Sequence, residues 1–408
     1  MKNIYIFDEH ISSQKNGIGT FLSQLIYSLD STQNNINIVS FNADSDEFNI
    51  VIDENQITRF LFPTFKGGHF ASSPKIIDKF FKLYIPDSKD NIFFLNHSPC
   101  NNLTKSLKES HPLSIVIFTI HDLGWTGSLL GNVEEYIHNI SNRINRDDKS
   151  NYILKSYDID SETYSKVDRV ICLSDDTYSL IKNNYNINSD KLSLIPNGLM
   201  DLSHSIYDID TQSIRAKKRI SSNDKILLFI GRPTKEKGLF DLIEAFKNLI
   251  DNYKGIKLVV VGDGNEASMK ELIKASSDIA SSIIYTGQLV EKELLEWISI
   301  SDIGVISSYY EQCSYTAIEM LRHGLPIVAS DGLGIRNMLI DNVNAIIANI
   351  GNRKRPEEYQ ENLKNAIAEL LDSNELCEKL SINARKTYAD RYHIRHMKQR
   401  YQELIELL

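Results

Sequence analysis

The chain has 408 residues, of which 42% are hydrophobic and 24% are charged. This composition is typical of a soluble globular protein, and the length is too great for one ordinary core, so two domains are expected. The formal net charge of -9 disfavours a nucleic-acid partner, because there is no basic excess to bind phosphates.

The cysteines and the N-terminus bear on the compartment. No C-x-x-C pair occurs, so a zinc site or disulfide framework is not expected, and a reducing compartment fits. The cysteines are Cys100, Cys172, Cys313 and Cys377. Residues 1–8 predict a strand rather than a signal peptide, and no apolar run approaches the roughly 20 residues that span a bilayer. We therefore expect a cytoplasmic protein.

Strand and helix patterns alternate along the chain. The apolar runs are mostly continuous, as in strands buried on both faces of a parallel sheet. The predicted strands are residues 4–7, 36–41, 92–95, 115–120, 170–173, 226–230, 257–261, 283–286, 303–306 and 327–329. The predicted helices are residues 19–29, 175–184, 239–252, 267–276 and 291–299. This alternation predicts an α/β fold with two Rossmann-like, doubly wound domains.

The division between the domains is predicted near Asn197 and Gly198, before a polar stretch at 203–224. We predict an N-terminal Rossmann-like domain at 1–200, a C-terminal Rossmann-like domain at 201–390 and a helix at 391–408. Residues 142–164 are polar with few strand signals, which indicates an insertion or helical excursion. The basic cluster at 215–219 could make a weak peripheral contact with anionic lipid, although its short length favours a solvated helix face.

Seven residues separate two carboxylates, those of Glu311 and Glu319. A helix that begins near Ser314 would place Glu311 in the preceding loop and Glu319 in the second helical turn. The free backbone N–H groups at the start of that helix would form an anion site. We assign these donors to Cys313, Ser314, Tyr315 and Thr316. A sugar nucleotide has the matching layout of sugar hydroxyls, diphosphate and ribose hydroxyls, whereas the bare spacing also fits a solvated helix face.

Glycine-rich loops follow several predicted strands. Gly231 and Arg232 come directly after the 226–230 strand, and Lys237 lies five residues on. Arg232 can hold a phosphate with two hydrogen bonds, and Lys237 adds a point charge. Gly17 and Gly19 precede the first helix and would let the backbone approach a phosphate. Each loop also fits an ordinary polar turn.

Other candidates lie at the carboxyl ends of predicted strands, where such sheets bind ligands. Gly262, Gly264 and Leu289 follow two strands of the second half. His121 follows the 115–120 run, where the ordinary interpretation is a hydrogen-bonded histidine at a strand end. His97 is a weaker candidate of the same kind, and Trp125 could shape an acceptor site.

These residues resemble the E-x7-E signature of retaining, GT-B-fold glycosyltransferases of family 4, the glycosyl transferases group 1. The 231–238 loop resembles the family's G-R-x-x-x-x-K-G element, and the 323–330 run resembles its small-residue turn and strand. The resemblance implies that two domains face a cleft and that the C-terminal helix crosses back to the first domain. It also implies that Arg232 and Lys237 hold the donor diphosphate and that His121 touches the transferred sugar.

The resemblance further implies a place for the loop glycines. Gly17 and Gly19 would lie across the cleft from the diphosphate. Gly262, Gly264 and Leu289 would flank the nucleotide base through backbone contacts. We predict that Glu311 faces the donor sugar and acts in catalysis, while Glu319 binds the ribose.

The chain departs from the family pattern at two places. After Glu311, Gln312-Cys313-Ser314 stands where the family usually has a glycine, an apolar residue and a small residue. Further on, Leu333 separates Gly332 from Gly334, and Asn337 replaces an acid. These changes leave the fold and reaction class in place and weaken any inference about the donor sugar.

The sequence predicts a retaining glycosyltransferase that moves a hexose or N-acetylhexosamine from a UDP- or GDP-sugar to a glycan, lipid-linked or peptide acceptor. No cofactor and no metal are expected, because the D-x-D letters at 158–160 and 208–210 follow no strand, and cations can neutralise the diphosphate. The alternatives are another GT-B enzyme, namely a sugar-nucleotide epimerase or a phosphorylase, and a non-catalytic glycan- or protein-binding partner. The sequence gives no indication of the oligomeric state.

Overall fold

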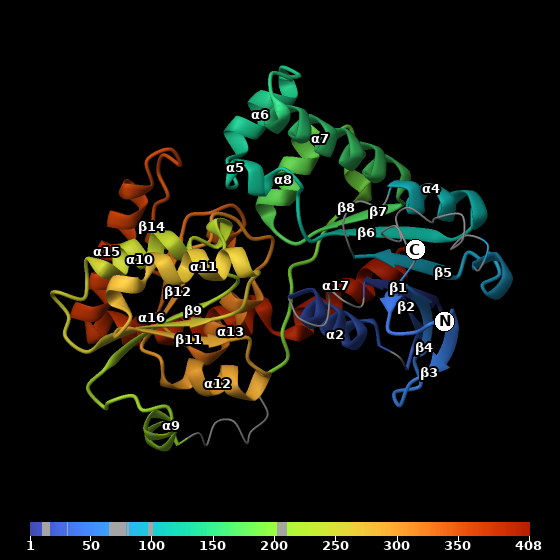
Figure 1. Cartoon of the computed structure of the whole chain (residues 1–408). Coiled ribbons are helices and arrows are strands. Elements are labelled where there is room, and N and C mark those ends of the chain that lie inside the picture. Colours follow the sequence, from blue (N-terminus) through green and yellow to red (C-terminus); the bar gives the residue numbers. More distant parts are fainter. Residues whose placement is uncertain (10–16, 31, 65–78, 80, 97–100, 202–209) are drawn as a thin grey trace. The chain divides into compact units, whose positions relative to one another are not determined.

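The computed structural model describes residues 1–9, 17–30, 32–64, 79, 81–96, 101–201 and 210–408 (Figure 1). The chain divides into two compact units. Unit 1 consists of Met1–Gly198 and Ile394–Leu408, and unit 2 consists of Leu199–His393. The last segment of the chain therefore belongs to the first unit, as expected for the C-terminal helix.

Unit 1 contains an eight-stranded sheet in the order β3-β4-β2-β1-β5-β6-β7-β8. Only the β3–β4 pair is antiparallel among the described strand pairs. The central strands are continuous apolar runs whose side chains are buried on both faces. The strands are β1 (Asn3–Glu9), β2 (Asn35–Ala43), β3 (Asn49–Ile52), β4 (Thr58–Pro63), β5 (Asn91–Leu95), β6 (Ile115–Ile120), β7 (Arg169–Cys172) and β8 (Leu192–Leu194).

The helices of unit 1 pack against this sheet and one another. The C-terminal helix α17 packs on α2, and its Tyr401 ring lies 6.1 Å from the ring of Phe94 on β5. The described helices are α2 (Gly17–Leu29), α4 (Asn101–Ser110), α5 (Thr126–Leu129), α6 (Val133–Ser141), α7 (Asp148–Lys166), α8 (Asp175–Asn184) and α17 (Ile394–Glu406). Burial of Tyr401 and Phe94 fixes the last helix in this unit.

Unit 2 contains a six-stranded, all-parallel sheet in the order β11-β10-β9-β12-β13-β14. The order reverses between β9 and β12, where neighbouring strands leave a natural ligand position at their carboxyl ends. The strands are β9 (Lys225–Ile230), β10 (Ile256–Val261), β11 (Ile283–Gly287), β12 (Ile303–Ile306), β13 (Ile327–Ser330) and β14 (Ile346–Ala348).

Helices cover both faces of the unit 2 sheet (Figure 1). On one face α10 packs with α11 and α15, and on the other α12 packs with α13, and α13 with α16. The helices are α9 (Thr211–Lys217), α10 (Leu239–Lys247), α11 (Glu266–Ala275), α12 (Glu291–Ile300), α13 (Tyr315–His323), α14 (Ile335–Met338), α15 (Pro356–Asp372) and α16 (Asn374–Thr387). Both units therefore have the predicted doubly wound α/β fold.

Every predicted strand is present, but four further strands were not predicted: β3, β4 and β8 in unit 1, and β14 at one edge of the unit 2 sheet. The helix predicted at 239–252 ends earlier, at Lys247, because Asn248 begins a turn region. The 142–164 stretch forms most of α7, which confirms the helical excursion. Its Asp147 and Ser150 make a reciprocal capping box at the helix start.

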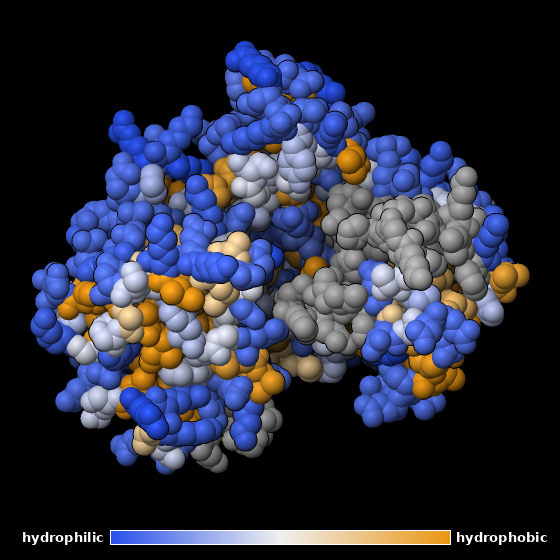
Figure 2. All heavy atoms as spheres, in the orientation of Figure 1, coloured by the Kyte–Doolittle hydropathy of each residue, from blue (hydrophilic) through white to orange (hydrophobic). Residues whose placement is uncertain are grey.

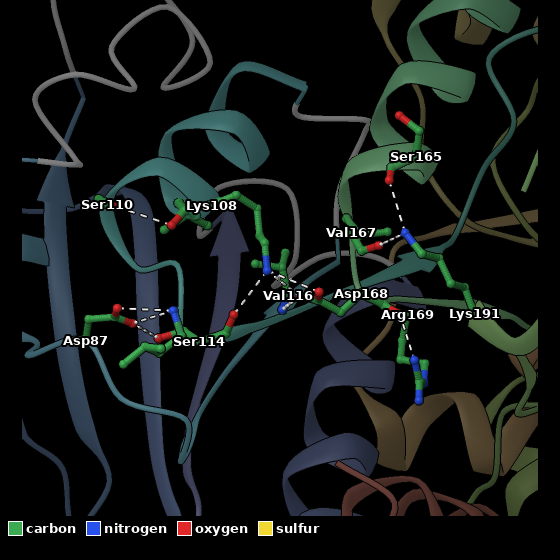
Figure 3. Close-up of polar contacts among 12 residues, drawn as sticks. Asp87, Lys108, Ser110, Ser114, Val116, Ser165, Val167, Asp168, Arg169 and Lys191 are labelled. Atoms are coloured by element: carbon green, nitrogen blue, oxygen red, sulfur yellow. Dashed lines mark hydrogen bonds and ion pairs between the residues drawn. The ribbon is translucent and has the colours of Figure 1, made fainter. Parts of the chain in front are cut away.

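A polar cluster joins the amino ends of β6, β7 and β8 (Figure 3). The Lys108 ammonium donates to both oxygens of Asp168, at 3.1 and 2.8 Å. Asp168 also accepts the Val116 N–H at 2.8 Å, and Lys191 donates to the Val167 carbonyl at 2.9 Å. These bonds tie α4 and α7 to the start of the strands, at the sheet edge opposite to that expected for a ligand.

The surface and the helices were also compared with what a membrane contact would require. Hydrophilic side chains predominate on the face in Figure 2, and the hydrophobic ones form separate small groups. No helix in the described ranges is both long enough and apolar enough to cross a membrane.

The basic cluster at 215–219 is not simply a solvated face, because Lys217 and Lys218 both pair with Glu296 on α12. Lys218 also lies 4.6 Å from the centre of the Trp297 ring.

Candidate functional site

Two loops at the carboxyl ends of β9 and β12 are bonded into one structure. We call them the 231–238 loop and the 307–314 loop. Tyr309 donates its N–H to the Glu236 carbonyl at 2.8 Å, and the Ser307 hydroxyl donates to the Lys237 carbonyl at 3.0 Å. Gly238 has φ +64, and a Cβ there would lie 2.0 Å from the Ser307 carbonyl oxygen. Only glycine allows this approach.

This contact brings Lys237 and Glu311 together. The Lys237 Nζ donates to Glu311 Oε1 at 2.6 Å, and their side chains are 23% and 17% exposed. The Ser308 hydroxyl donates to the same Oε1 at 2.9 Å. Glu311 thus lies in the loop before α13, as predicted, and it is the direct partner of the predicted phosphate-binding lysine.

A buried network supports the 307–314 loop from behind. The Tyr309 hydroxyl donates to Asp241 Oδ2 on α10 at 2.9 Å, and Gln360 on α15 donates to Asp241 Oδ1 at 3.1 Å. The Tyr359 hydroxyl donates to the Ser307 carbonyl at 2.8 Å. Burial raises the pKa of Asp241, and the bonds from Gln360 and Tyr309 oppose that rise. The loop is therefore anchored through α10 and α15.

Gly332 and Gly334, which Leu333 separates in the sequence, pack closely against the backbone of the 307–314 loop. Glu311 donates its N–H to the Leu333 carbonyl at 2.9 Å. A Cβ at Gly334 would lie 2.0 Å from the Glu311 carbonyl oxygen, and one at Gly332 would lie 2.7 Å from the Tyr309 carbonyl oxygen. The family commonly has two adjacent glycines, whereas here Leu333 stands between Gly332 and Gly334. Both glycines lie where the backbone of this segment contacts the backbone of the 307–314 loop.

Helix α13 begins as predicted, with Ser314 as its N-cap. The Ser314 hydroxyl accepts the Ala317 N–H at 3.3 Å. The prediction of free donors from Cys313 to Thr316 was wrong for Ser314, because its N–H donates to Met338 Sδ at 3.3 Å. Thr316 lies in the first turn with a half-buried side chain, while Cys313 and Tyr315 are buried. The predicted anion site therefore has fewer backbone N–H donors available than expected.

Glu319 lies in the second turn of α13, as predicted, and is half-buried. Burial raises the pKa of Glu319 to about 7; Arg322 opposes this rise, whereas Glu291 adds to it. The next turn contains His323, whose Nδ1 lies 2.8 Å from the Glu319 carbonyl oxygen. Burial lowers the pKa of His323 to about 4, so this histidine is neutral at pH 7.

The remaining unit 2 candidates surround the 231–238 loop. The Arg232 side chain is exposed and has no hydrogen-bond partner among the described residues. A Cβ at Gly262 would lie 2.1 Å from the Gly231 carbonyl oxygen, and one at Gly264 would lie 2.8 Å from Pro233 Cγ. These glycines thus let the β10 loop approach the 231–238 loop. Leu289 is half-buried just after β11.

The unit 1 candidates form a separate group. His121 packs edge-on against Phe21 of α2, with 4.4 Å between the ring centres. Gly17 and Gly19 lie inside the first turn of α2, whereas a loop before a helix at residue 19 had been predicted. The prediction for Trp125 was wrong, because its side chain is fully buried and stacks on Tyr136 at 4.1 Å. His97 lies outside the described residues.

Carboxylates outside the two loops do not form a metal-binding cluster in the described chain. No group of three or more His, Cys, Asp or Glu side chains could hold a metal ion in these ranges. Asp160, from the D-x-D letters at 158–160, is buried in α7, and burial raises its pKa to about 8. The second set of letters begins at Asp208, outside the described residues.

The sequence analysis did not assign a role to Ser308, Asp241 or Tyr359. Ser308 is three residues before Glu311, which on a loop does not predict a side-chain contact. Asp241 and Tyr359 are far from the loop in sequence, and only packing joins them to Ser307 and Tyr309. The sequence signal that could have revealed them is a polar residue on the apolar face of a helix, namely Asp241 on α10 and Tyr359 on α15.

Parts of the chain resemble known proteins in sequence. Residues 210–387 match the family described as "Glycosyl transferases group 1". The alpha-D-kanosaminyltransferase of Streptomyces kanamyceticus is 27% identical over 193 residues, which are 47% of this chain and 48% of that protein. The alpha-monoglucosyldiacylglycerol synthase of Streptococcus pneumoniae is 26% identical over 212 residues, which are 51% of this chain and 46% of that protein. The chain thus spans about half the length of these curated relatives.

Solved structures match over the whole chain. The sucrose-phosphate synthase of Thermosynechococcus elongatus has a TM-score of 0.79 at 15% identity, covering 100% of this chain and 99% of that one. Anabaena HepE in complex with UDP-glucose has a TM-score of 0.74 at 14% identity, covering 100% of both chains. At these identities the likeness shows the fold. The chain therefore has the two-domain GT-B fold, and its residues 210–387 match the model of the glycosyl transferases group 1 family.

Proposed function

We infer that the protein is a glycosyltransferase that takes its sugar from a nucleotide diphosphate sugar. The observation that carries this inference is the contact of Lys237 with Glu311 at the carboxyl ends of β9 and β12. In that contact a cation suited to phosphate lies beside a carboxylate suited to sugar hydroxyls, at the point where doubly wound sheets bind ligands. The group 1 domain and the GT-B fold, shared with a protein solved with UDP-glucose, support it.

The chemistry follows from charge. As the bond from the sugar to the diphosphate breaks, negative charge grows on the phosphate and positive charge on the sugar ring. Arg232 and Lys237 would stabilise the first, and Glu311 the second. The leaving phosphate would take the acceptor's proton on the same face of the sugar, which retains the anomeric configuration. Glu319 would accept hydrogen bonds from the ribose hydroxyls.

Substrate details belong to the same proposal. A UDP- or GDP-sugar would donate a hexose or N-acetylhexosamine to a glycan, lipid-linked or peptide acceptor. Arg232 and Lys237 supply two positive charges to the diphosphate, so we propose catalysis without a divalent metal. His121 would touch the transferred sugar, and a cytoplasmic location fits cysteines without a C-x-x-C pair.

The alternatives lack support in the described site. A sugar-nucleotide epimerase needs acid and base side chains near the sugar, and none beyond Glu311 and His121 was identified. A non-catalytic partner would have no need for the set of Arg232, Lys237, Glu311 and Glu319 around the carboxyl ends of β9 and β12. The glycosyltransferase is therefore the better reading.

The test is a thermal-shift screen over nucleoside diphosphates and nucleotide sugars, followed by measurement of nucleoside diphosphate release. A true donor at about 100 times its dissociation constant should stabilise the fold by about 2.7 kcal/mol. Release should continue when a chelator is present. If no nucleotide sugar stabilises the protein, the proposed function is wrong; if magnesium is needed to restore release, only the metal-independent mechanism is wrong.

A further inference from the structure

One oxygen of the proposed catalytic carboxylate has two side-chain donors. Lys237 Nζ lies 2.6 Å from Glu311 Oε1, and the Ser308 hydroxyl lies 2.9 Å from the same atom. The ammonium can make three hydrogen bonds and is attracted to any nearby anion, whereas the hydroxyl has one proton to donate. The two donors therefore differ in what a bound diphosphate would do to them.

Ser308 is held more rigidly than its place in a loop suggests. Its side chain is only 4% exposed. Its carbonyl accepts the Ser330 hydroxyl at 2.5 Å, and a Cβ at Gly332 would lie 2.8 Å from the same carbonyl oxygen. On either side of it, the Ser307 hydroxyl donates to the Lys237 carbonyl and the Tyr309 N–H donates to the Glu236 carbonyl. The hydroxyl thus projects toward Glu311 from a backbone that neighbours fix on both sides.

A diphosphate at the 231–238 loop would compete with Glu311 for Lys237, because both are anions and the lysine flexes more easily than the loop. Once Lys237 bonds to phosphate, Glu311 loses its ionic partner but keeps the Ser308 hydroxyl. We propose that Ser308 is a positioning residue that holds Glu311 in place while Lys237 exchanges that carboxylate for the donor diphosphate. This proposal rests on the proposed function. It adds that Lys237 moves from Glu311 to the diphosphate when the donor binds, while Ser308 stays bonded to Glu311.

The first test replaces Ser308. A carboxylate that loses a charge-assisted hydrogen bond in the donor complex should be misplaced, so Ser308→Ala should lower kcat for donor turnover by about 10-fold or more. Binding of the nucleoside diphosphate should change by less than about 2-fold, since the hydroxyl touches no phosphate. Ser308→Thr, which keeps the hydroxyl, should recover most of the rate. Ser308→Cys, with a weakly donating thiol, should behave like alanine.

The matched control is Ser301→Ala at the opposite end of β12. Its hydroxyl also makes one hydrogen bond, to the Trp297 carbonyl at 2.7 Å, and the whole of β12 separates it from the site. This variant should keep wild-type kcat and KM. If Ser308→Ala and Ser308→Cys both turn over like Ser301→Ala, the role of Ser308 is wrong. A loss that threonine does not restore, or one that appears in KM rather than kcat, also overturns it.

The second test concerns the exchange itself. If the ion pair competes with the diphosphate, Glu311→Gln should release Lys237 and tighten nucleoside diphosphate binding. A partly exposed pair contributes about 0.2–1 kcal/mol, so we expect a tightening of up to about 5-fold by calorimetry. Lys237→Met should weaken binding. If Glu311→Gln weakens binding, Lys237 is not exchanged, and the proposal fails while the function stands. If wild type binds no nucleoside diphosphate, both fail.

Discussion

Two lysine–carboxylate pairs in this protein have the same chemistry and different surroundings. In unit 1, Lys108 contacts Asp168 at 2.8 Å, and their side chains are 27% and 35% exposed. In unit 2, Lys237 contacts Glu311 at 2.6 Å, with side chains 23% and 17% exposed. Distance and burial alone do not separate a structural pair from a functional one.

The bonding partners do separate them. Asp168 also accepts the Val116 N–H, and Lys108 also donates to the Ser114 carbonyl at 3.3 Å, so that pair is part of the backbone structure at the amino ends of the strands (Figure 3). Among the residues that the structure describes, Glu311 Oε1 accepts hydrogen bonds from the side chains of Lys237 and Ser308 alone, at the carboxyl ends of the strands. Lys237 can therefore leave Glu311 for a ligand without breaking a backbone hydrogen bond of the pair. Separating Lys108 from Asp168 would also disturb the hydrogen bonds that these side chains make with the backbone.

The largest expected effect is on turnover. Glu311→Gln removes the charge that would stabilise the sugar ring in the transition state, so turnover should fall by about 100-fold or more. Nucleoside diphosphate affinity should not weaken, because this carboxylate does not hold the phosphate. Steady-state kinetics and calorimetry on the same variant measure both. Equal losses in turnover and affinity would show that Glu311 binds rather than reacts.

The second effect is on affinity. Glu319→Gln should weaken nucleoside diphosphate binding about 10- to 100-fold, because charge-assisted hydrogen bonds to ribose hydroxyls contribute roughly 1.5–3 kcal/mol. Turnover at saturating donor should change less than in Glu311→Gln. Calorimetry at pH 8, where Glu319 is ionised, gives the clearest measurement. Unchanged affinity there would remove Glu319 from the ribose site.

The third effect tests the contact between the two loops. Gly238 and Gly287 have similar backbone angles, with φ +64 and +68, but a Cβ meets the Ser307 carbonyl at Gly238 and nothing within 4 Å at Gly287. Gly287→Ala should cost only the strain of a left-handed residue, about 1–2 kcal/mol. Gly238→Ala should destabilise by about 2 kcal/mol more, because backbone must move. Denaturant unfolding of both variants measures this, and equal losses would contradict the close approach.

The fourth effect is a pH dependence. Because the pKa of Glu319 is raised to about 7 in the folded chain, the folded state holds a proton that the unfolded state releases near pH 4.5. Stability from this group is complete below pH 4.5 and is lost as pH rises through 7. Glu319→Gln, which stays neutral, should therefore gain about 1–3 kcal/mol relative to wild type between pH 5 and 8. Parallel unfolding curves at all pH values would contradict the burial argument.

The smallest expected effect is a loss of stability from a substitution in unit 1. Asp168→Ala removes the partner of Lys108 and the acceptor of the Val116 N–H, so the free energy of unfolding should fall by about 1–2 kcal/mol. Turnover by the remaining folded protein should equal that of wild type. Denaturant unfolding and kinetics with active-site titration check both statements. A loss of turnover as large as that of Glu311→Gln would mean that the two pairs do not differ as proposed.

Local patterns in the sequence were sufficient for the scaffold. Continuous apolar runs predicted every strand in the middle of a sheet except β4, and Ser314 predicted the start of α13. The position of Glu311 before that helix and of Glu319 in its second turn followed directly. Helix N-caps and strand patterns depend on residues that are close in sequence, so composition and spacing are enough to recognise them.

Contacts between distant residues could not be predicted in this way. Only packing brings Met338 to the Ser314 N–H, buries Trp125 against Tyr136 and places Tyr359 on the Ser307 carbonyl. The same is true of Lys237 and Glu311, which lie 74 residues apart and were each predicted without the other as partner. The sequence by itself determined the two α/β units and the types of residue at the ends of their strands. The tertiary structure decided which of those residues touch, because parallel strands bring the ends of distant segments to one edge of a sheet.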